Sequence, residues 1–227
     1  MKTGNIALSI LLVMLLTSMV WVNTELRAVY YNIDLTDKLR NYQSIEVDHY
    51  TVLKISGSNG YPIEILSSEE TEVKVLRSRM SQFKYQMAGD TLIIDFAGAR
   101  VSPSALAHST TPAGIIISSS ILKSLVLEDT HNRISGLDQH QLNLLLKGNS
   151  YTELSNNLLG TLSLQAEANS NFEFKHENAS DTVLLALTGG SVGFLEGLSY
   201  HVFEPVLEDS ALIVLSKNAL RELMQNP

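Results

Sequence analysis

The segment LLLKGNSYTEL (residues 144–154) is followed by LQAEANSNFEF (164–174) and then by LALTGGSVGF (185–194). Each copy contains a short run in which apolar and polar residues alternate, which is the two-residue period of a β-strand. A turn of Gly, Asn and Ser separates the runs. The three copies therefore indicate a repeating unit of about 20 residues that is made of short strands and turns.

The spacing of individual residues extends this repeat over residues 122–215. One set stands at equal intervals of 20: Ile134, Leu154, Phe174 and Phe194. A second set stands at intervals of 20, 20 and 21: Thr130, Ser150, Ser170 and Ser191. Strands this short bury a face only when equivalent strands stack on them at about 4.8 Å. The period predicts an all-β fold, a parallel β-helix with two or three strands per coil and leucine columns inside.

One turn of the repeat carries a polar column. Asp129, Asn149 and Asn169 also stand at equal intervals of 20. Stacked in register, such side chains hydrogen-bond to one another along the axis. We interpret this column as structural rather than as a ligand site.

Composition limits the class of protein. The 227 residues suffice for one domain with a sizeable core. The chain has no cysteine, so disulfides and thiolate metal sites are excluded. Its net charge is -8 without basic clusters, which argues against nucleic acid as a partner.

The N-terminal segment predicts a membrane anchor. Residues 5–22 are apolar except for four small polar side chains, and Lys2 is the one charge in residues 1–24. This length is near the minimum for a spanning helix, and Lys2 favours a cytoplasmic N-terminus. Trp21 stands at the far end, where an interfacial aromatic residue is expected. A cleaved signal peptide is the alternative, but the segment lacks an Ala-x-Ala site. Either way, the repeat domain is predicted to be exported.

The chain divides into four predicted parts. Residues 1–24 form the transmembrane signal-anchor (or signal peptide), and residues 25–44 a linker with a short helix at about residues 36–42. Residues 45–215 form the β-helix, and residues 216–227 a short amphipathic C-terminal cap. The segment Ala97 to Ala113 interrupts the repeat and is rich in Ala, Ser, Thr and Pro. A long loop on a rigid scaffold is a usual place for function, although it is as often a tolerated insertion.

Residues that could carry chemistry do not converge. Glu153 and Glu173 share a column, with Arg133 one repeat earlier and Gly193 one repeat later. Two stacked glutamates can bind a cation or share a proton, but we interpret them as part of a solvated outer strand face.

The other candidate groups are also explained by structure. Asp129 and His131, with Glu128 and His140, lack the spacing of metal ligands, and the histidines are interpreted as surface residues. The segment Gly189-Gly190-Ser191-Val192-Gly193 contains the letters G-x-S-x-G of a nucleophile elbow, but it stands where the repeat places its turn and is interpreted as structural. The aromatic residues at column positions are expected in the core: Phe172, Phe174 and Phe194. The sequence predicts no catalytic, cofactor-binding or metal-binding residue, and no cofactor.

The chain resembles a known family at three places. These are Ile45-Glu46-Val47 with Tyr50 to Ile55, then Gly89 to Ile94, and finally the Leu/Ser/Asn coils. With the N-terminal anchor, they resemble the bacterial auto-transporter adhesin head family, the GIN domain, over about residues 45–215. The resemblance implies a right-handed parallel β-helix on an exported, often membrane-tethered protein, without a catalytic motif to carry over. The loop Ala97 to Ala113 departs from a simple member.

These observations together predict function only coarsely. The leading hypothesis is a non-enzymatic, adhesin-like module in the bacterial cell envelope. It would be held in the inner membrane by a single N-terminal helix and would bind an envelope protein or glycan. The alternatives are a polysaccharide-active β-helix enzyme and a structural β-helix that assembles end to end into a homo-oligomer.

Overall fold

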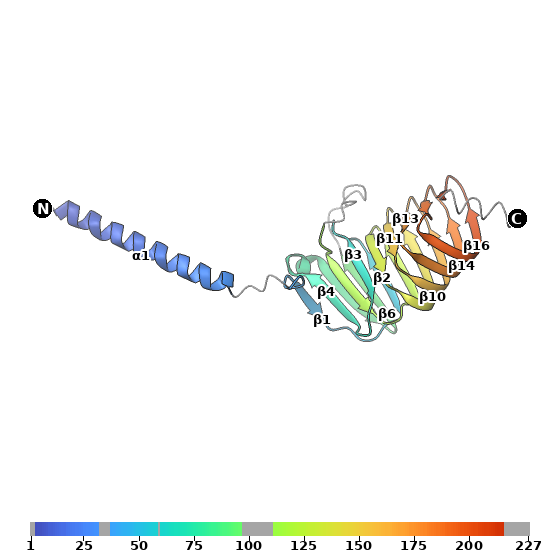
Figure 1. The fold of residues 1–227 in the computed structure, drawn as a ribbon, viewed down its shortest axis with the longest axis horizontal. Coiled ribbons are helices and arrows are strands. Elements are labelled where there is room, and N and C mark those ends of the chain that lie inside the picture. Colours follow the sequence, from blue (N-terminus) through green and yellow to red (C-terminus); the bar gives the residue numbers. More distant parts are fainter. Residues whose placement is uncertain (1–2, 32–36, 59, 97–110, 216–227) are drawn as a thin grey trace. The chain divides into compact units, whose positions relative to one another are not determined.

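The computed structural model describes residues 3–31, 37–58, 60–96 and 111–215 (Figure 1). The chain forms two compact units, Met1–Asn41 and Tyr42–Pro227. The first contains one helix and the second contains all the strands. The tail predicted to act as a cap, residues 216–227, lies outside the described residues.

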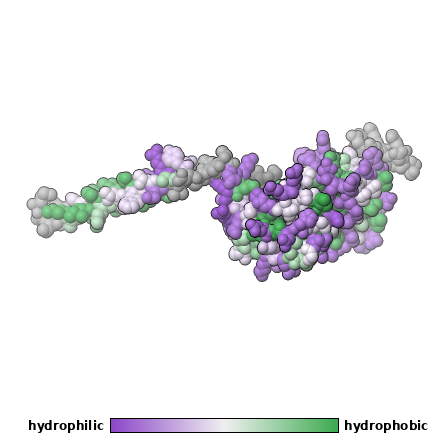
Figure 2. All heavy atoms as spheres, turned by 90° about the horizontal axis from the view of Figure 1, so that it is seen from below, coloured by the Kyte–Doolittle hydropathy of each residue, from purple (hydrophilic) through white to green (hydrophobic). Residues whose placement is uncertain are grey.

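The N-terminal unit is the helix α1 (Thr3–Tyr31). Its segment Ile6–Ala28 is long and apolar enough to cross a membrane, and none of it is buried inside the protein. Figure 2 shows hydrophobic residues along much of this helix. The helix continues beyond the predicted boundary at residue 24, and Arg27 Nη2 donates a hydrogen bond to the Tyr31 hydroxyl in its last turns (3.3 Å).

The short helix predicted at about residues 36–42 is wrong for the residues that the structure describes. Residues 38–41 form a turn, and Tyr42 already begins a strand. The local pattern was overridden by sheet pairing, because Tyr42 lies opposite Leu76 on an antiparallel neighbour. Its hydroxyl also donates to the Ala113 carbonyl (2.7 Å).

The strands belong to two sheets. Sheet A contains, in spatial order, β1 (Tyr42–Ile45), β4 (Glu72–Leu76), β7 (Ile115–Ser119), β3 (Ile63–Ser67), β9 (His131–Ser135), β11 (Tyr151–Ser155), β13 (Asn171–Lys175), β15 (Val192–Phe194) and β17 (Leu212–Val214). Sheet B contains β16 (Leu198–Leu207), β14 (Asn178–Leu187), β12 (Leu158–Ala166), β10 (Asp138–Lys147), β8 (Ser124–Glu128), β2 (Val52–Ser56), β6 (Thr91–Phe96) and β5 (Phe83–Ala88). A short 3₁₀ helix, η1 (Arg77–Gln82), precedes β5.

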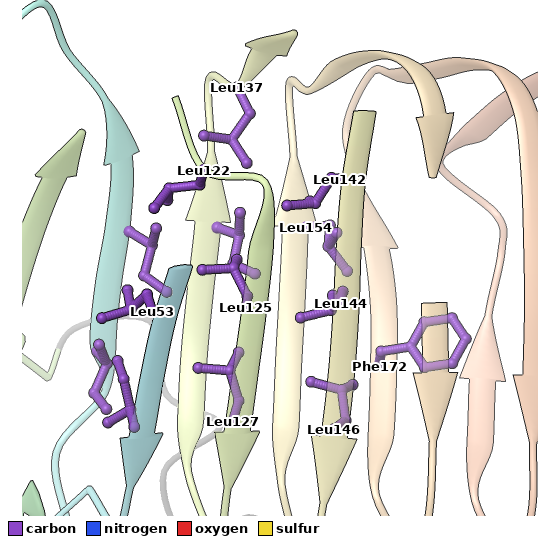
Figure 3. Packing of buried hydrophobic residues seen from close by; sticks show 14 of the residues in the cluster. Leu53, Leu122, Leu125, Leu127, Leu137, Leu142, Leu144, Leu146, Leu154 and Phe172 are labelled. Atoms are coloured by element: carbon purple, nitrogen blue, oxygen red, sulfur yellow. The ribbon is translucent and has the colours of Figure 1, made fainter. Parts of the chain in front are cut away.

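The solenoid predicted from the period is confirmed between β8 and β17. A strand of sheet B is followed by a strand of sheet A in each coil, and equivalent strands pair in parallel from coil to coil. Ile134, Leu154 and Phe174 occupy one column, as their equal spacing predicts. Figure 3 shows Leu125 and Leu127 beside Leu144 and Leu146 on the neighbouring strand. The core is therefore a stack of apolar side chains along the axis.

The prediction that Phe194 is the fourth member of that column is wrong. Phe194 lies opposite Glu173, points outward and is 39% exposed. Leu195 is buried instead. Ser155 is paired with Lys175, 20 positions later, but Leu158 is paired with Ala179, 21 positions later, so the chain gains one residue between these two points. A shift of one residue moves a side chain to the other face of a strand.

The order of the first strands differs from the order of the sequence. β6 and β7 lie beyond β2 and β3, on the side away from β8, so that the chain must return past them to begin the regular coils. β1, β4 and β5 then pair antiparallel and close this end of the stack. The segment predicted as an interrupting loop connects β6 to β7. Its residues 97–110 lie outside the described part of the chain.

Two polar columns stabilise the turns. Thr130, Ser150, Ser170 and Ser191 are buried as a column. The three serine hydroxyls donate to backbone carbonyls, as Ser150 Oγ does to the Lys147 carbonyl (2.7 Å), and the Thr130 hydroxyl lies 3.3 Å from Ser150 Oγ. Across the core, Asn157 Nδ2 donates to Asn178 Oδ1 (2.9 Å).

The predicted asparagine column at the Asp129 turn is confirmed for its first step, since Asn149 Nδ2 donates to Asp129 Oδ1 (3.4 Å). The buried asparagine pair lies at a different turn from the one that the sequence predicted.

Candidate functional site

The long strands of sheet B bend at one position in each coil. Residues 139 and 141 of β10 pair with 159 and 161 of β12, and the residues between them do not pair. The same interruption recurs between β12, β14 and β16. It places four residues in one column along the bend: His140, Gly160, Asp181 and His201.

A groove follows this bend along the axis of the solenoid. It has a volume of about 540 Å³ and is lined by three residues from each of four successive coils, 138–140, 158–160, 179–181 and 199–201. Three coil-to-coil steps of about 4.8 Å make it roughly 14 Å long. We call it the axial groove.

Two small residues, Gly160 and Ala179, line the middle of the axial groove. A side-chain carbon added to Gly160 would lie 2.6 Å from the His140 carbonyl oxygen, so a larger residue does not fit there. Ala179 occupies the next coil. Gln139 closes one end, because its Nε2 donates to the Leu122 carbonyl (2.6 Å) and its Oε1 accepts from the Leu122 N–H (3.1 Å).

The groove combines apolar and hydrogen-bonding groups. Leu158 is 55% exposed in it, and the Tyr200 ring is stacked on Phe203 with ring centroids 4.9 Å apart. Asp181 Oδ1 lies 3.5 Å from His201 Nδ1, and both side chains are mostly exposed. Such a surface can bind a ligand that presents apolar faces and hydroxyl groups in alternation.

The glutamate column of the sequence lies on the outer face of sheet A. Glu153 is adjacent to both Arg133 and Glu173, as predicted, but Phe194 rather than Gly193 follows them. Lys175 Nζ bridges the two carboxylates, 2.8 Å from Glu153 and 3.5 Å from Glu173. The glutamates are therefore neutralised by a lysine of the same chain and are not a bare solvated face. We call these residues the outer ladder.

Two rings beside the outer ladder are shielded from water. The Tyr151 hydroxyl donates to Glu173 Oε2 (2.7 Å), and burial together with this carboxylate raises the pKa of Tyr151. His131, whose ring centroid lies 5.2 Å from that of Tyr151, is only 2% exposed. The interpretation of His131 as a surface residue is wrong.

The environment of His131 keeps its ring neutral. Neither ring nitrogen has a hydrogen-bond partner. Burial lowers the pKa of His131 to about 4. Glu153 opposes the change, and Arg133 and Lys175 add to it.

The structure separates the residues considered as a metal cluster. Asp129 lies in a turn with a positive φ of 52°, His131 is buried on the outer face of sheet A, and His140 lines the axial groove. Within the described ranges, no group of three or more His, Asp or Glu side chains could hold a metal ion.

Sequence reasoning missed the axial groove. Its signal was present as the intervals of 20, 21 and 20 in the bend column, but these side chains share no chemical type.

Comparison with known proteins supports the fold. No protein-family model and no curated protein sequence matches the chain. A crystal structure of a candidate adhesin from Parabacteroides merdae is similar, with a TM-score of 0.55 at 15% identity over 77% of this chain and 80% of that one. A candidate adhesin from Parabacteroides distasonis has a TM-score of 0.48 at 16% identity, over 77% of each chain. A candidate lipid-binding protein from the same organism has a TM-score of 0.45 at 14% identity, over 77% of this chain and 93% of that one.

The first of these likenesses places the solenoid in a fold that a candidate adhesin shares. Membership of the GIN domain family stays a prediction from the sequence resemblance.

Proposed function

We propose that the protein is a non-enzymatic, adhesin-like binding module of the bacterial cell envelope, and that its axial groove holds an extended glycan strand. The observation that carries this proposal is the groove itself, which crosses four coils and repeats its geometry at each one. A polymer with a repeating unit makes similar contacts at successive coils, so weak contacts add along its length.

The chemistry of the groove favours an uncharged or amino-sugar glycan. Its backbone is already paired within sheet B on both sides of the bend, so a peptide cannot bind there by adding a strand. Asp138 and Asp181 place two carboxylates in the groove, which disfavours an anionic polymer. Sugar hydroxyls can form hydrogen bonds with carboxylate and imidazole groups, and a sugar ring can pack on Leu158.

The helix α1 supports a membrane-tethered form of this module. Its apolar segment Ile6–Ala28 is long enough to span the hydrocarbon core. In the proposed arrangement the helix crosses the inner membrane once and the solenoid is exported. Retention of the full chain in membranes after an alkaline wash is expected, and its release would contradict the tether.

The groove is tested by binding of soluble neutral and N-acetylated amino-sugar oligosaccharides to the full chain in detergent. Ala179→Tyr fills the middle of the groove and Asp181→Ala removes an acceptor. We expect each to weaken binding at least tenfold, which corresponds to about 1.4 kcal/mol. The matched control is Ser155→Tyr, which adds the same ring on the outer face of sheet A and should leave binding unchanged.

Two outcomes would contradict this proposal. If binding survives Ala179→Tyr, the ligand binds outside the axial groove. If none of the oligosaccharides binds, a glycan is not the ligand. The contacting pair Asp181 and His201 also calls for a check on hydrolysis. Shortened oligosaccharides after prolonged incubation would favour the alternative of a polysaccharide-active enzyme.

A further inference from the structure

The axial groove contains carboxylates that no basic side chain in it neutralises. Asp138 and Asp181 both line the groove, whereas no lysine or arginine is among the described residues that do so. The outer ladder is different, because there Lys175 Nζ lies 2.8 Å from Glu153 Oε1. Asp181 has a second carboxylate oxygen besides the one that lies 3.5 Å from His201 Nδ1. The carboxylates of the groove are therefore available to a ligand.

The outward side chains form two rows along the groove. In each coil one inward residue separates two outward residues, because side chains along a strand alternate between its faces. Residues of successive coils follow one another in each row at about 4.8 Å. The first row is Asp138, Leu158, Ala179 and Ser199, and the second row is His140, Gly160, Asp181 and His201.

A backbone carbonyl takes the place of a side chain at Gly160. The His140 carbonyl oxygen lies 2.6 Å from the position that a Cβ on Gly160 would occupy, so this oxygen is directed toward the surface of the groove. A carbonyl oxygen has two lone pairs, so it can accept a hydrogen bond from a ligand in addition to one within the sheet. Asp181 is the next residue of the same row, and Asp138 lies in the other row, one coil before Gly160. Three groups that only accept hydrogen bonds therefore surround Gly160.

We propose that these three acceptors bind a primary ammonium group, and that the glycan held in the groove is one whose amino sugars carry free amino groups. We call the three acceptors the ammonium subsite: the Asp138 carboxylate, the His140 carbonyl and the Asp181 carboxylate. The inference rests on the proposed function of the groove and specifies its ligand.

The donors and acceptors of the two forms of an amino sugar differ at this subsite. An ammonium group has three N–H donors and no acceptor, and its positive charge is attracted to the two carboxylates. An N-acetyl group has a single N–H, and its carbonyl oxygen is an acceptor that would face other acceptors. The subsite therefore favours the free amine over the acetylated one.

An amino sugar fits the subsite better than a lysine side chain of a protein does. Leu158 is two residues before Gly160 on the same strand and is 55% exposed. A sugar ring that packs on Leu158 carries its amino group directly on the ring, close to the subsite. The ammonium group of lysine stands at the end of a flexible four-carbon chain, so ordering it costs more side-chain entropy.

The subsite is tested by comparing two oligosaccharides of equal length and linkage, one of glucosamine and one of N-acetylglucosamine, on the full chain in detergent. We expect the glucosamine oligomer to bind about three- to tenfold more tightly in low salt, because exposed ion pairs contribute modestly. The preference should be smaller in 1 M salt, which screens the attraction.

Charge-removing substitutions locate this preference in the groove. Asp138→Asn and Asp181→Asn each keep an acceptor oxygen and remove one negative charge. Each is expected to lower the ratio of the two affinities by about twofold or more. The matched control is Glu128→Gln, which removes a negative charge at an exposed position opposite Lys147, away from the groove. It should leave the ratio unchanged.

The outcomes separate this inference from the proposed function. If the N-acetylated oligomer binds at least as tightly as the glucosamine oligomer, and Ala179→Tyr weakens both, the groove holds a glycan but the ammonium subsite is wrong. If neither oligomer binds, the proposed function fails and the subsite fails with it. If a lysine peptide of equal charge binds as tightly as the glucosamine oligomer, the groove recognises charge alone and the assignment of a sugar is overturned.

Discussion

The inner columns and the outer ladder follow nearly the same period but differ in what surrounds them. Leu127, Leu146, Ala166 and Leu187 occupy successive positions of one inner column, and these four residues are fully buried. Arg133, Glu153 and Glu173 occupy an outer column, in which water reaches every member. The period of the repeat determines which residues are neighbours. The face of the sheet on which they lie determines how much each of them contributes to stability.

The largest effect is expected inside the stack. Leu146 packs between Leu127 and Ala166 of the adjacent coils, so Leu146→Ala removes apolar burial and leaves a cavity. We expect it to lower the free energy of unfolding by about 3 kcal/mol, measured by chemical denaturation.

Leu207→Ala provides the matched control for this prediction. It truncates the same column at the half-exposed end, and it should cost less than about 1 kcal/mol. Equal losses at the two positions would contradict the view that burial by both neighbouring coils determines the contribution of a column residue.

Much of this interior was predictable from the sequence, and its limits have a physical cause. Alternation and equal spacing identified Ile134, Leu154 and Phe174 as one column. The same spacing failed at Phe194, because one extra residue in a turn reverses the face of every later position. The order of β2, β3, β6 and β7 was not predictable, because alternation identifies strands without indicating which strands are neighbours.

The candidate site was less predictable than the core. The two glutamates were correctly paired, but their neutralisation by Lys175 depends on a diagonal contact between strands. The axial groove depends on a bend of the backbone and on a close approach of two coils that admits only glycine at position 160. These features depend on how the backbone is arranged in space, and the sequence carries only a weak pattern that would indicate them.

We expect an effect of intermediate size on the unfolding free energy from His131. This residue is an exception among the outer positions, because it lies on the outer face of the sheet and is nevertheless buried. Its pKa falls from an ordinary 6.5 to about 4 through burial. The fold favours the neutral form of the His131 ring. Above pH 6.5 this ring is neutral in the unfolded chain as well, so the full stability of the folded protein is present there. That stability is lost as the pH falls from 6.5 through 4, because the unfolded chain binds the proton more readily.

The loss attributable to His131 is on the order of 2–3 kcal/mol near pH 4. His131→Phe should reduce the decline in unfolding free energy between pH 6.5 and pH 4 by about this amount. His140→Phe, at an exposed histidine of the axial groove, should leave the decline unchanged. If the unfolding free energy declines equally in the wild type and in His131→Phe, His131 is not the cause of the decline.

The smallest effect is expected in the outer ladder. Lys175 bridges Glu153 and Glu173 while its side chain is 36% exposed, and ion pairs in contact with water are typically worth less than about 1 kcal/mol. Lys175→Met keeps most of the aliphatic chain and removes the charge. It should lower the unfolding free energy by about 0.5–1 kcal/mol in low salt, since the two carboxylates then repel each other, and by less in 1 M salt, where the repulsion is screened. Lys123→Met, at an exposed lysine outside the ladder, should show neither the loss nor the salt dependence. A loss as large as that of Leu146→Ala would mean that the outer column contributes to stability as much as the core does, and the distinction between inner and outer columns would then fail.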